Sequence, residues 1–247
     1  MACPDAPAVS PRARPGRFPA RALRVLGLIV AALVALLLVL IVAWRVLPPV
    51  STLMLARWVT GQPVDRRYVP LEAIAPQLAA AVIVSEDARF CSHRGVDWDA
   101  LSEVLSDEDG PSRGASTLTM QTVKNLFLWP SRSYVRKALE VPLALLLDAT
   151  WPKRRIMEVY LNIAEWGPGI FGAEAAAQRL FGRPAAALGV REATLLAAAL
   201  PNPIVRNAAR PGRHHARLAA VTGARLAGAG ALTACLGGGA KKSTLPG

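Results

Sequence analysis

The chain contains the stretch LAAAVIVSEDARFCSHRGVD at residues 78–97, in which an uninterrupted apolar run leads directly into a cluster of polar side chains. The apolar run is typical of a buried helix, and we predict a helix over residues 78–86. A carboxylate that leaves an apolar helix end is poorly hydrated, which raises its pKa and suits a general acid or base. Glu86 is therefore a catalytic candidate. The alternative is that Glu86 and Asp87 form an ordinary acidic pair on a hydrated surface. His93 is expected to form structural hydrogen bonds, since it lacks partners for a zinc site.

A second polar cluster, RGASTLTMQTVKNLFL, lies at residues 113–128. Small residues followed by Ser116 and Thr117 at a helix start expose backbone N–H groups and hydroxyls, which suits phosphate. Three further polar residues share one face of the following helix at three- and four-residue spacing: Gln121, Lys124 and Asn125. The segment has neither a GxxxxGK[ST] phosphate loop nor a GxSxG nucleophile elbow. A plain Ser or Thr cap before an amphipathic helix is the structural alternative.

The third cluster is RSYVRKALE at residues 132–140. Ser133 can cap a helix, after which Arg136 and Lys137 lie four and three residues before Glu140 on one face. An exposed ion-pair trio would contribute less than about 1 kcal/mol to stability. The very apolar stretch that follows argues instead that this face borders a buried or lipid-facing region.

The three clusters together place cations between two glutamates, Glu86 and Glu140. Among these cations are Lys124, Arg132, Arg136 and Lys137. This set fits glycosyl transfer from a diphosphate leaving group, because a base removes the proton of the acceptor hydroxyl while cations stabilise the departing pyrophosphate. A glycoside hydrolase also needs paired carboxylates, but it does not need the cations.

Apolar residues recur at three- and four-residue spacing through the rest of the chain, and no sustained alternation of polar and apolar residues occurs. Residues 156, 159, 160 and 163 give one such helical pattern. We therefore predict a mostly α-helical fold, with turns at the glycine and proline clusters near residues 110–111 and 167–169.

Residues 25–44 carry no charge, and a run of about 20 apolar residues is long enough to span a bilayer as a helix. The arm before it holds five arginines against one aspartate, which predicts that the arm stays in the cytoplasm. The chain has a formal net charge of +12, of which +7 lies beyond Val46, so an anionic external ligand is favoured over a cationic one.

We expect four parts along the chain: a basic arm at 1–24, a transmembrane signal anchor at 25–46, a catalytic domain at 47–206 and a poorly ordered tail at 207–247. The three cysteines, Cys3, Cys91 and Cys235, are widely spaced and form no CxxC motif. We predict that all three are free thiols, because Cys235 lies in the tail and Cys3 lies on the other side of the membrane from Cys91.

At these clusters the sequence resembles the monofunctional biosynthetic peptidoglycan glycosyltransferases, which are similar to the glycosyltransferase domain of class A penicillin-binding proteins. The resemblance rests on ordered motifs: SEDARFCSHRGVDWDAL, GASTLTMQTVKNLFL, RSYVRKALE, KRRIMEVYLNIAEWGPGIFGAEAAAQRLFG and ATLLAAALPNP. It departs from the family pattern at Met120, where a glutamine is usual, at Leu180, where an aromatic residue is usual, and after Asn207. No serine has a lysine three residues later, so the penicillin-binding transpeptidase nucleophile is absent.

The resemblance implies a lysozyme-like, two-lobed helical domain behind the single membrane helix. It implies that Glu86 is the general base for the 4-hydroxyl of the acceptor, lipid II, and that Glu140 lies at the donor's diphosphate. The remaining implied contacts to the donor and the cleft are Lys124, Arg132, Lys137, Arg136, Ser116, Thr117, Gln121 and Asn125. An inverting transfer would form a β-1,4 bond and release undecaprenyl diphosphate.

The implied partners are lipid II, the lipid-linked glycan strand, the membrane and wall-synthesis or division proteins, but no nucleic acid. The family uses a divalent cation, Mg or Mn, in some members, although the sequence shows no metal-ligand set. The implied location is the bacterial inner membrane, with the catalytic domain periplasmic. The alternatives are a lytic, glycan-cleaving enzyme of lysozyme-like fold and a membrane-anchored, non-catalytic wall-binding module.

Overall fold

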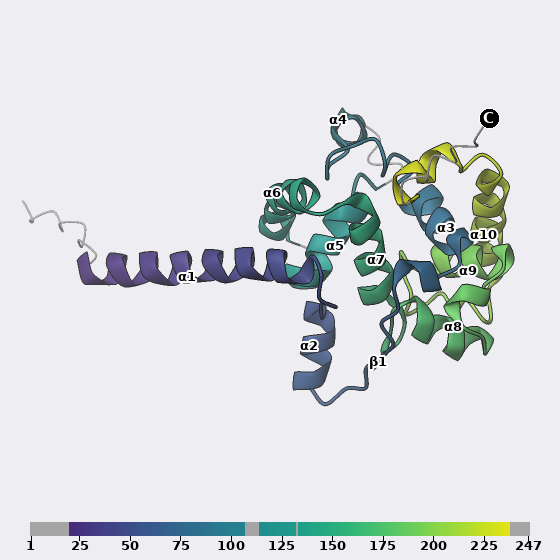
Figure 1. The fold of residues 1–247 in the computed structure, drawn as a ribbon, viewed down its shortest axis with the longest axis horizontal. Helices are drawn as coiled ribbons and strands as arrows, with labels where there is room; N and C mark the ends of the chain where they lie inside the picture. The colour runs from purple at the N-terminus through teal and green to yellow at the C-terminus, as the bar shows by residue number, and fades with distance from the viewer. Residues whose placement is uncertain (1–19, 107–113, 132, 238–247) are drawn as a thin grey trace, which may run out of the picture. The chain divides into compact units, whose positions relative to one another are not determined.

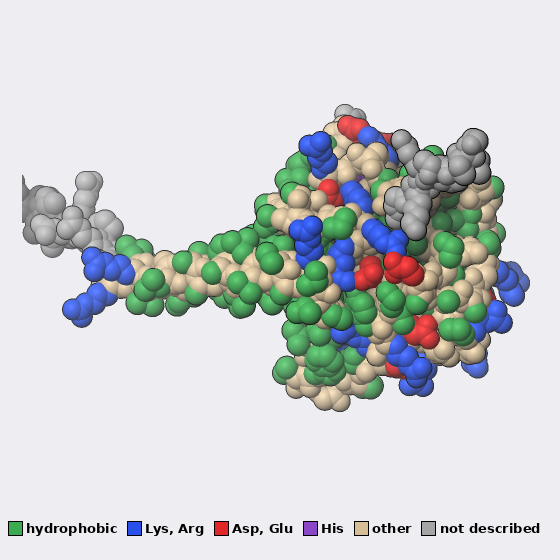
Figure 2. Space-filling model, in the orientation of Figure 1, with side chains coloured by type: hydrophobic (Ala, Val, Ile, Leu, Met, Phe, Trp, Pro, Cys, Tyr) green, Lys and Arg blue, Asp and Glu red, His purple; other side chains and the backbone are tan. Residues whose placement is uncertain are grey.

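The computed structural model describes residues 20–106, 114–131 and 133–237, and the chain divides into two compact units, residues 1–40 and 41–247. The first unit is described by helix α1 (Ala20–Trp44), which runs on into the second unit. Its segment Arg21–Trp44 is the one helix among the described residues that is long and apolar enough to cross a membrane. Apolar side chains cover the visible face of α1, with basic side chains at its start (Figure 2). These properties are compatible with the predicted single-pass anchor.

The second unit is mostly helical, as the apolar spacing predicts (Figure 1). Its helices and short 3₁₀ turns are α2 (Thr52–Val59), η1 (Leu71–Ala73), α3 (Pro76–Glu86), α4 (Trp98–Ser106), α5 (Leu118–Phe127), α6 (Tyr134–Thr150), α7 (Lys153–Ile163), α8 (Ala173–Phe181), η2 (Ala185–Ala187), α9 (Val190–Ala199), α10 (Arg213–Leu226) and η3 (Ala231–Leu236).

Helix α3 confirms the helix predicted from the apolar run at residues 78–86. It begins at Pro76, because proline suits the first helical position, where its missing N–H costs no hydrogen bond. Leu78, Val82 and Ile83 are completely buried, and each such side chain contributes about 1.5–3 kcal/mol through burial. Helix α3 packs against α9 and α10, whereas α5 packs against α6 and α7 (Figure 1). Glu86 thus ends a helix that is fixed in the core.

A small sheet of order β1-β3-β2 joins β1 (Asp65–Arg66), β2 (Glu165–Gly167) and β3 (Ile170–Phe171). Strands β2 and β3 are antiparallel, and the predicted turn at residues 167–169 connects them. Gly169 has φ +74°, and a Cβ there would lie 2.8 Å from the carbonyl oxygen of Pro63. The turn therefore requires glycine. The predicted turn at residues 110–111 lies outside the described residues.

Residues 41–47, at the start of the second unit, are held by side chains of α5, of α7 and of the junction between α6 and α7. Trp151 Nε1 donates to the carbonyl oxygen of Ile41 at 2.9 Å, and Arg155 Nη2 donates to those of Trp44 at 2.8 Å and Leu47 at 2.6 Å. The last carbonyls of α1, which have no partner within the helix, thereby gain donors and a positive charge. The Trp44 ring also stacks on Phe127, with ring centroids 5.3 Å apart.

The C-terminal part differs from the expected poorly ordered tail. Residues 213–226 form α10, which packs on α9 and buries His215, Ala219 and Thr222. His215 Nε2 lies 2.8 Å from the carbonyl oxygen of Leu195. This C-terminal part is rich in alanine and glycine, whose weak apolar signal hides the helical pattern in the sequence. Residues 238–247 lie outside the described residues, and the boundaries predicted for the four parts remain predictions.

Cys91 and Cys235 form a disulfide, with their Cα atoms 5.4 Å apart. The prediction of free thiols is therefore wrong for this pair. The two residues are 144 positions apart, and only the return of the chain through α10 and η3 brings them together. Cys3 lies outside the described residues.

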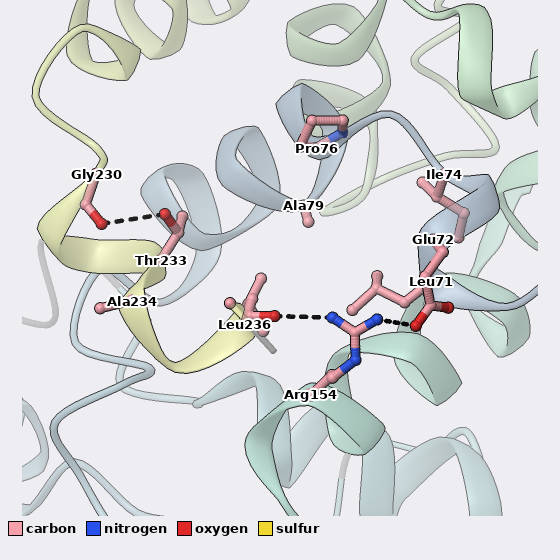
Figure 3. A pocket seen from close by; sticks show the side chains of 11 residues that line it. Leu71, Glu72, Ile74, Pro76, Ala79, Arg154, Gly230, Thr233, Ala234 and Leu236 are labelled. Carbon is pink, nitrogen blue, oxygen red and sulfur yellow. Dashed lines mark hydrogen bonds and ion pairs between the residues drawn. The ribbon is translucent and has the colours of Figure 1, made fainter. Parts of the chain in front are cut away.

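The segment that the disulfide holds forms one wall of a cavity of about 500 Å³ between η1, α3, α7 and η3 (Figure 3). Arg154 crosses this space, donating to the carbonyl oxygen of Leu236 at 2.8 Å and forming an ion pair with Glu72. None of the predicted site residues that the structure describes lines this cavity. We therefore assign it to the packing of η3 and not to the candidate site.

The disulfide is expected to stabilise the folded chain by about 2–4 kcal/mol, because it closes a long loop in the unfolded state. Reductant should lower the free energy of unfolding of the wild-type protein by that amount, measured by denaturant titration. A variant carrying Cys91→Ser and Cys235→Ser should show no effect of reductant. Equal wild-type stability with and without reductant, together with two alkylatable thiols at these positions, would contradict the pairing.

Candidate active site

The carboxylate of Glu86 is partly buried at the end of α3. Burial raises its pKa above the ordinary value, and the neighbouring charge of Asp87 raises it further. A hydrogen bond from Gln121 and the charges of Lys124 and Arg206 act in the opposite direction, but burial is the largest effect. A poorly hydrated carboxylate of this kind is suited to accept a proton.

Gln121 joins Glu86 to the core. Its Nε2 donates to Oε2 of Glu86 at 3.1 Å, and its Oε1 accepts from the hydroxyl of Tyr160 at 3.0 Å. Tyr160 belongs to α7 and is 1% exposed. The three side chains therefore form one line of hydrogen bonds that runs from the core to the catalytic candidate.

The buried carboxylate of Asp87 fixes the loop that follows Glu86. Its Oδ2 accepts from the backbone N–H of Leu118 at 2.8 Å and lies 2.9 Å from Nε2 of His93. This confirms the structural role predicted for His93. Because Leu118 is the first residue of α5, the same carboxylate also satisfies a free N–H at the start of that helix.

Thr117 caps α5 and is almost completely buried. Its Oγ1 accepts from the backbone N–H of Met120 at 3.1 Å and donates to the carbonyl oxygen of Gly95 at 2.6 Å. The cap expected as the structural alternative is thus present. Both contacts hold the frame of the site, so we place Thr117 in that frame and not among groups free to bind substrate.

The second carboxylate, Glu140, lies on α6 and is 2% exposed. It forms ion pairs with Arg136 and with Lys137, whose Nζ lies 3.0 Å from Oε2. Lys137 Nζ also donates to the hydroxyl of Ser116 at 2.6 Å. The predicted face of α6 is confirmed, and Ser133 caps this helix as expected. The hydrogen bond from Lys137 brings Ser116 of the second cluster to the third cluster.

Lys124 of α5 extends this group toward Glu86. Burial lowers the pKa of Lys124, and the charge of Arg136 lowers it further, whereas Glu86 opposes the change. Burial, followed by repulsion from Arg136 and Lys124, lowers the pKa of Lys137 to about 8. We call Lys124, Arg136 and Lys137 the cation cluster. Its three positive charges repel one another, and Glu140 pairs with two of them, Arg136 and Lys137, so the cluster is suited to bind an anion.

For two of the predicted site residues, Arg132 and Asn125, the structure gives no side-chain hydrogen bond among the described residues. Arg132 lies outside the described residues. Asn125 follows Gln121 by one turn of α5 and accepts from Thr52 Oγ1 through its backbone carbonyl at 3.2 Å. Its side chain forms no hydrogen bond to another described residue, so it remains a predicted substrate contact.

The structure adds residues that sequence reasoning missed. In the sequence, Tyr160 is one more apolar position in the helical pattern of residues 156–163. The spacing does not reveal that its buried hydroxyl has a hydrogen-bond partner. Arg206 follows the last matching motif, yet its charge acts on Glu86 while its Nη1 donates to the carbonyl oxygen of Ala198 at 2.9 Å. Asp87 was considered only as half of an acidic pair.

The described side chains do not fit a divalent cation held by the protein. No group of three or more His, Cys, Asp or Glu that could hold a metal occurs among the residues described. Glu140, the buried carboxylate beside the cation cluster, is already paired with two cations. We therefore derive no step through a metal.

Comparison with known proteins gives consistent matches. The family model described as Transglycosylase matches residues 53–225. The chain is 54% identical over 211 residues to the biosynthetic peptidoglycan transglycosylase of Rhodospirillum centenum, covering 84% of this chain and 91% of that one. It is 52% identical over 217 residues to the protein of the same name from Brucella suis, covering 87% and 96%. The relative of that name from Agrobacterium fabrum is 52% identical over 214 residues, covering 86% and 95%.

The raised pKa of Glu86 predicts that its ionisation destabilises the fold. Stability is complete below the unfolded pKa of about 4.3 and falls as the pH rises through the higher folded pKa. Glu86→Gln, which cannot ionise, should therefore increase the free energy of unfolding at pH 7 by about 0.5–2 kcal/mol. The gain should vanish near pH 4. Thermal unfolding across this pH range tests it, and a less stable variant at pH 7 would show that the ionised carboxylate is favourable.

Proposed function

Because the chain belongs to the transglycosylase family, we propose that it uses Glu86 as general base and the cation cluster as the site of a lipid-linked diphosphate. The chain is a peptidoglycan glycosyltransferase, an enzyme of cell wall synthesis that polymerises glycan strands. The observation that carries the assignment is the juxtaposition of a poorly hydrated carboxylate and excess positive charge. Lys124 links the two, since its charge acts on both Glu86 and Arg136.

The reaction joins the acceptor hydroxyl to the anomeric carbon of the donor. Glu86 takes the proton from the 4-hydroxyl of lipid II as that oxygen forms the new β-1,4 bond. The bond from the anomeric carbon to the phosphate oxygen breaks, and the electron pair leaves with undecaprenyl diphosphate. Attack from the face opposite the leaving group inverts the α-linked donor, as the family's product requires. Gln121 holds the base in place during this step.

The cation cluster stabilises the negative charge that develops on the diphosphate as it leaves. Lys137 and Arg136 are held on α6 by Glu140, which orients them without cancelling the charge of the whole cluster. Ser116 accepts from Lys137 and has a hydroxyl proton to offer a phosphate oxygen. We assign Glu140 to positioning the cluster, since its own oxygens are occupied by Arg136 and Lys137.

We further propose that the arm lies in the cytoplasm and the catalytic domain in the periplasm. The five arginines of residues 1–24 support this orientation, and so does the disulfide between Cys91 and Cys235, because disulfides persist in oxidising compartments. Helix α2 supports contact with the bilayer, since Leu55, Trp58 and Val59 are 49%, 51% and 88% exposed. Met54 of the same helix is buried instead.

Glu86→Gln should reduce polymerisation of labelled lipid II by about 10²–10⁴. The matched control is Glu72→Gln, which makes the same chemical change in an exposed residue on η1 and should keep the wild-type rate. A near-normal rate for Glu86→Gln would exclude Glu86 as the base. Release of muropeptides from sacculi by the wild-type protein, without polymerisation, would support the lytic alternative. Parallel assays with a chelator test the need for a cation.

The lowered pKa of Lys137 predicts weaker donor binding in alkali. Lys137 loses its positive charge as the pH rises through about 8, so the KM for the lipid-linked donor should increase above that pH. Lys137→Arg keeps the charge, because arginine stays protonated, and its KM should change less between pH 7 and 9. Parallel KM profiles for the two proteins would show that Lys137 titration does not control donor binding.

A further inference from the structure

We propose that Tyr160 is a positioning residue for the catalytic carboxylate: its hydroxyl orients the amide of Gln121 so that the nitrogen, and not the oxygen, faces Glu86. This inference rests on the proposed role of Glu86 as general base. It assigns a function to a buried side chain that does not itself contact the carboxylate.

The geometry consists of two consecutive hydrogen bonds across three helices. Tyr160 of α7 donates to Oε1 of Gln121 at 3.0 Å, and Nε2 of Gln121 in α5 donates to Oε2 of Glu86 in α3 at 3.1 Å. Helices α5 and α7 pack directly against each other (Figure 1). Tyr160 is fixed by the core, whereas Glu86 is only partly buried, so the orienting influence runs outward.

The two hydrogen bonds favour the same orientation of the Gln121 amide. Burial and the negative charges of Glu86 and Asp87 raise the pKa of Tyr160 well above its ordinary value, so the hydroxyl keeps its proton. A hydroxyl that donates to Oε1 stabilises the amide orientation in which Nε2 donates to the carboxylate. The reversed amide would place Oε1 against an ionised carboxylate, with repulsion in place of a hydrogen bond.

Removing the hydroxyl leaves Oε1 of Gln121 without its donor and weakens the preference for the amide orientation in which Nε2 faces Glu86. Glu86 then loses part of the hydrogen bond that favours its ionised form, and its pKa should rise further. The other charges that act on Glu86 are those of Asp87 beside it, Lys124 of α5 and Arg206 after α9. None of these groups is changed by Tyr160→Phe, so a shift in the titration of Glu86 can be attributed to the hydroxyl.

The test is the pH profile of kcat/KM for lipid II polymerisation by Tyr160→Phe. The acid limb should move upward by about 0.5–1 pH unit, since one unit corresponds to about 1.4 kcal/mol and a hydrogen bond to a charged group is of that size. The loss of rate should be largest on the acid side and small on the alkaline side. A purely structural role would lower the rate without moving the limb.

The matched control is Tyr68→Phe. The hydroxyl of Tyr68 donates to Oε1 of Glu158 at 2.7 Å, in a network that contains neither Gln121 nor Glu86. This variant also removes one partly buried tyrosine hydroxyl, but its acid limb should coincide with that of the wild-type protein. A similar shift in both variants would indicate a general effect of lost stability and would overturn the proposal.

A second variant covers the case in which Tyr160→Phe does not fold. Gln121→Leu removes the donor to Glu86 while Tyr160 remains, and it should move the acid limb in the same direction. Adding Tyr160→Phe to Gln121→Leu should cause no further shift, because the hydroxyl acts through Gln121. An unmoved limb in Gln121→Leu, or an additive second shift, would contradict the inference. If Glu86→Gln polymerises lipid II normally, the failure instead lies with the proposed base.

Discussion

The arrangement of the site depends on one buried carboxylate, that of Asp87. Burying a charge is costly unless hydrogen bonds replace its lost hydration. Here Leu118 N–H donates at 2.8 Å and His93 Nε2 lies at 2.9 Å. Since Leu118 begins α5, the positive end of that helix dipole also favours the carboxylate. The contact fixes the end of α3 against the start of α5, and this is why Glu86 and Gln121 meet.

The two glutamates of the site have different surroundings, and different tasks follow from that. Glu86 accepts one hydrogen bond from a neutral amide and is raised in pKa by burial, so it can take up a proton. Glu140 is enclosed by Arg136 and Lys137 and serves as an orienting counter-ion. Two carboxyl groups of the same type thus gain separate roles through their environments. Lys124, between them, couples the charge of the base to that of the leaving-group site.

Much of the architecture could be predicted from the sequence, because an apolar run indicates the buried helix α3 and apolar residues at three- and four-residue spacing indicate α6 and α7. Glu86 could be identified as a candidate because it ends an apolar helix, and Lys137 and Glu140 because they share one helix face just before a very apolar stretch. The role of Tyr160 could not be predicted, since a tyrosine whose hydroxyl has a partner in the site and one that only packs in the core give the same sequence pattern. Arg206 and the pairing of Cys91 with Cys235 depend on where distant segments return, which local spacing does not encode. The order of α10 was hidden by its small side chains.

The disulfide has a consequence for the covalent connectivity of the enzyme. Cys91 and Cys235 close a ring that contains Gln121, Glu140 and Tyr160, whereas Glu86 lies just outside it on the N-terminal side. Cleavage of any single peptide bond within the ring would leave both fragments joined through sulfur. The base and the leaving-group site would then stay in one molecule, attached to the membrane helix, even after a proteolytic cut in the loops between them.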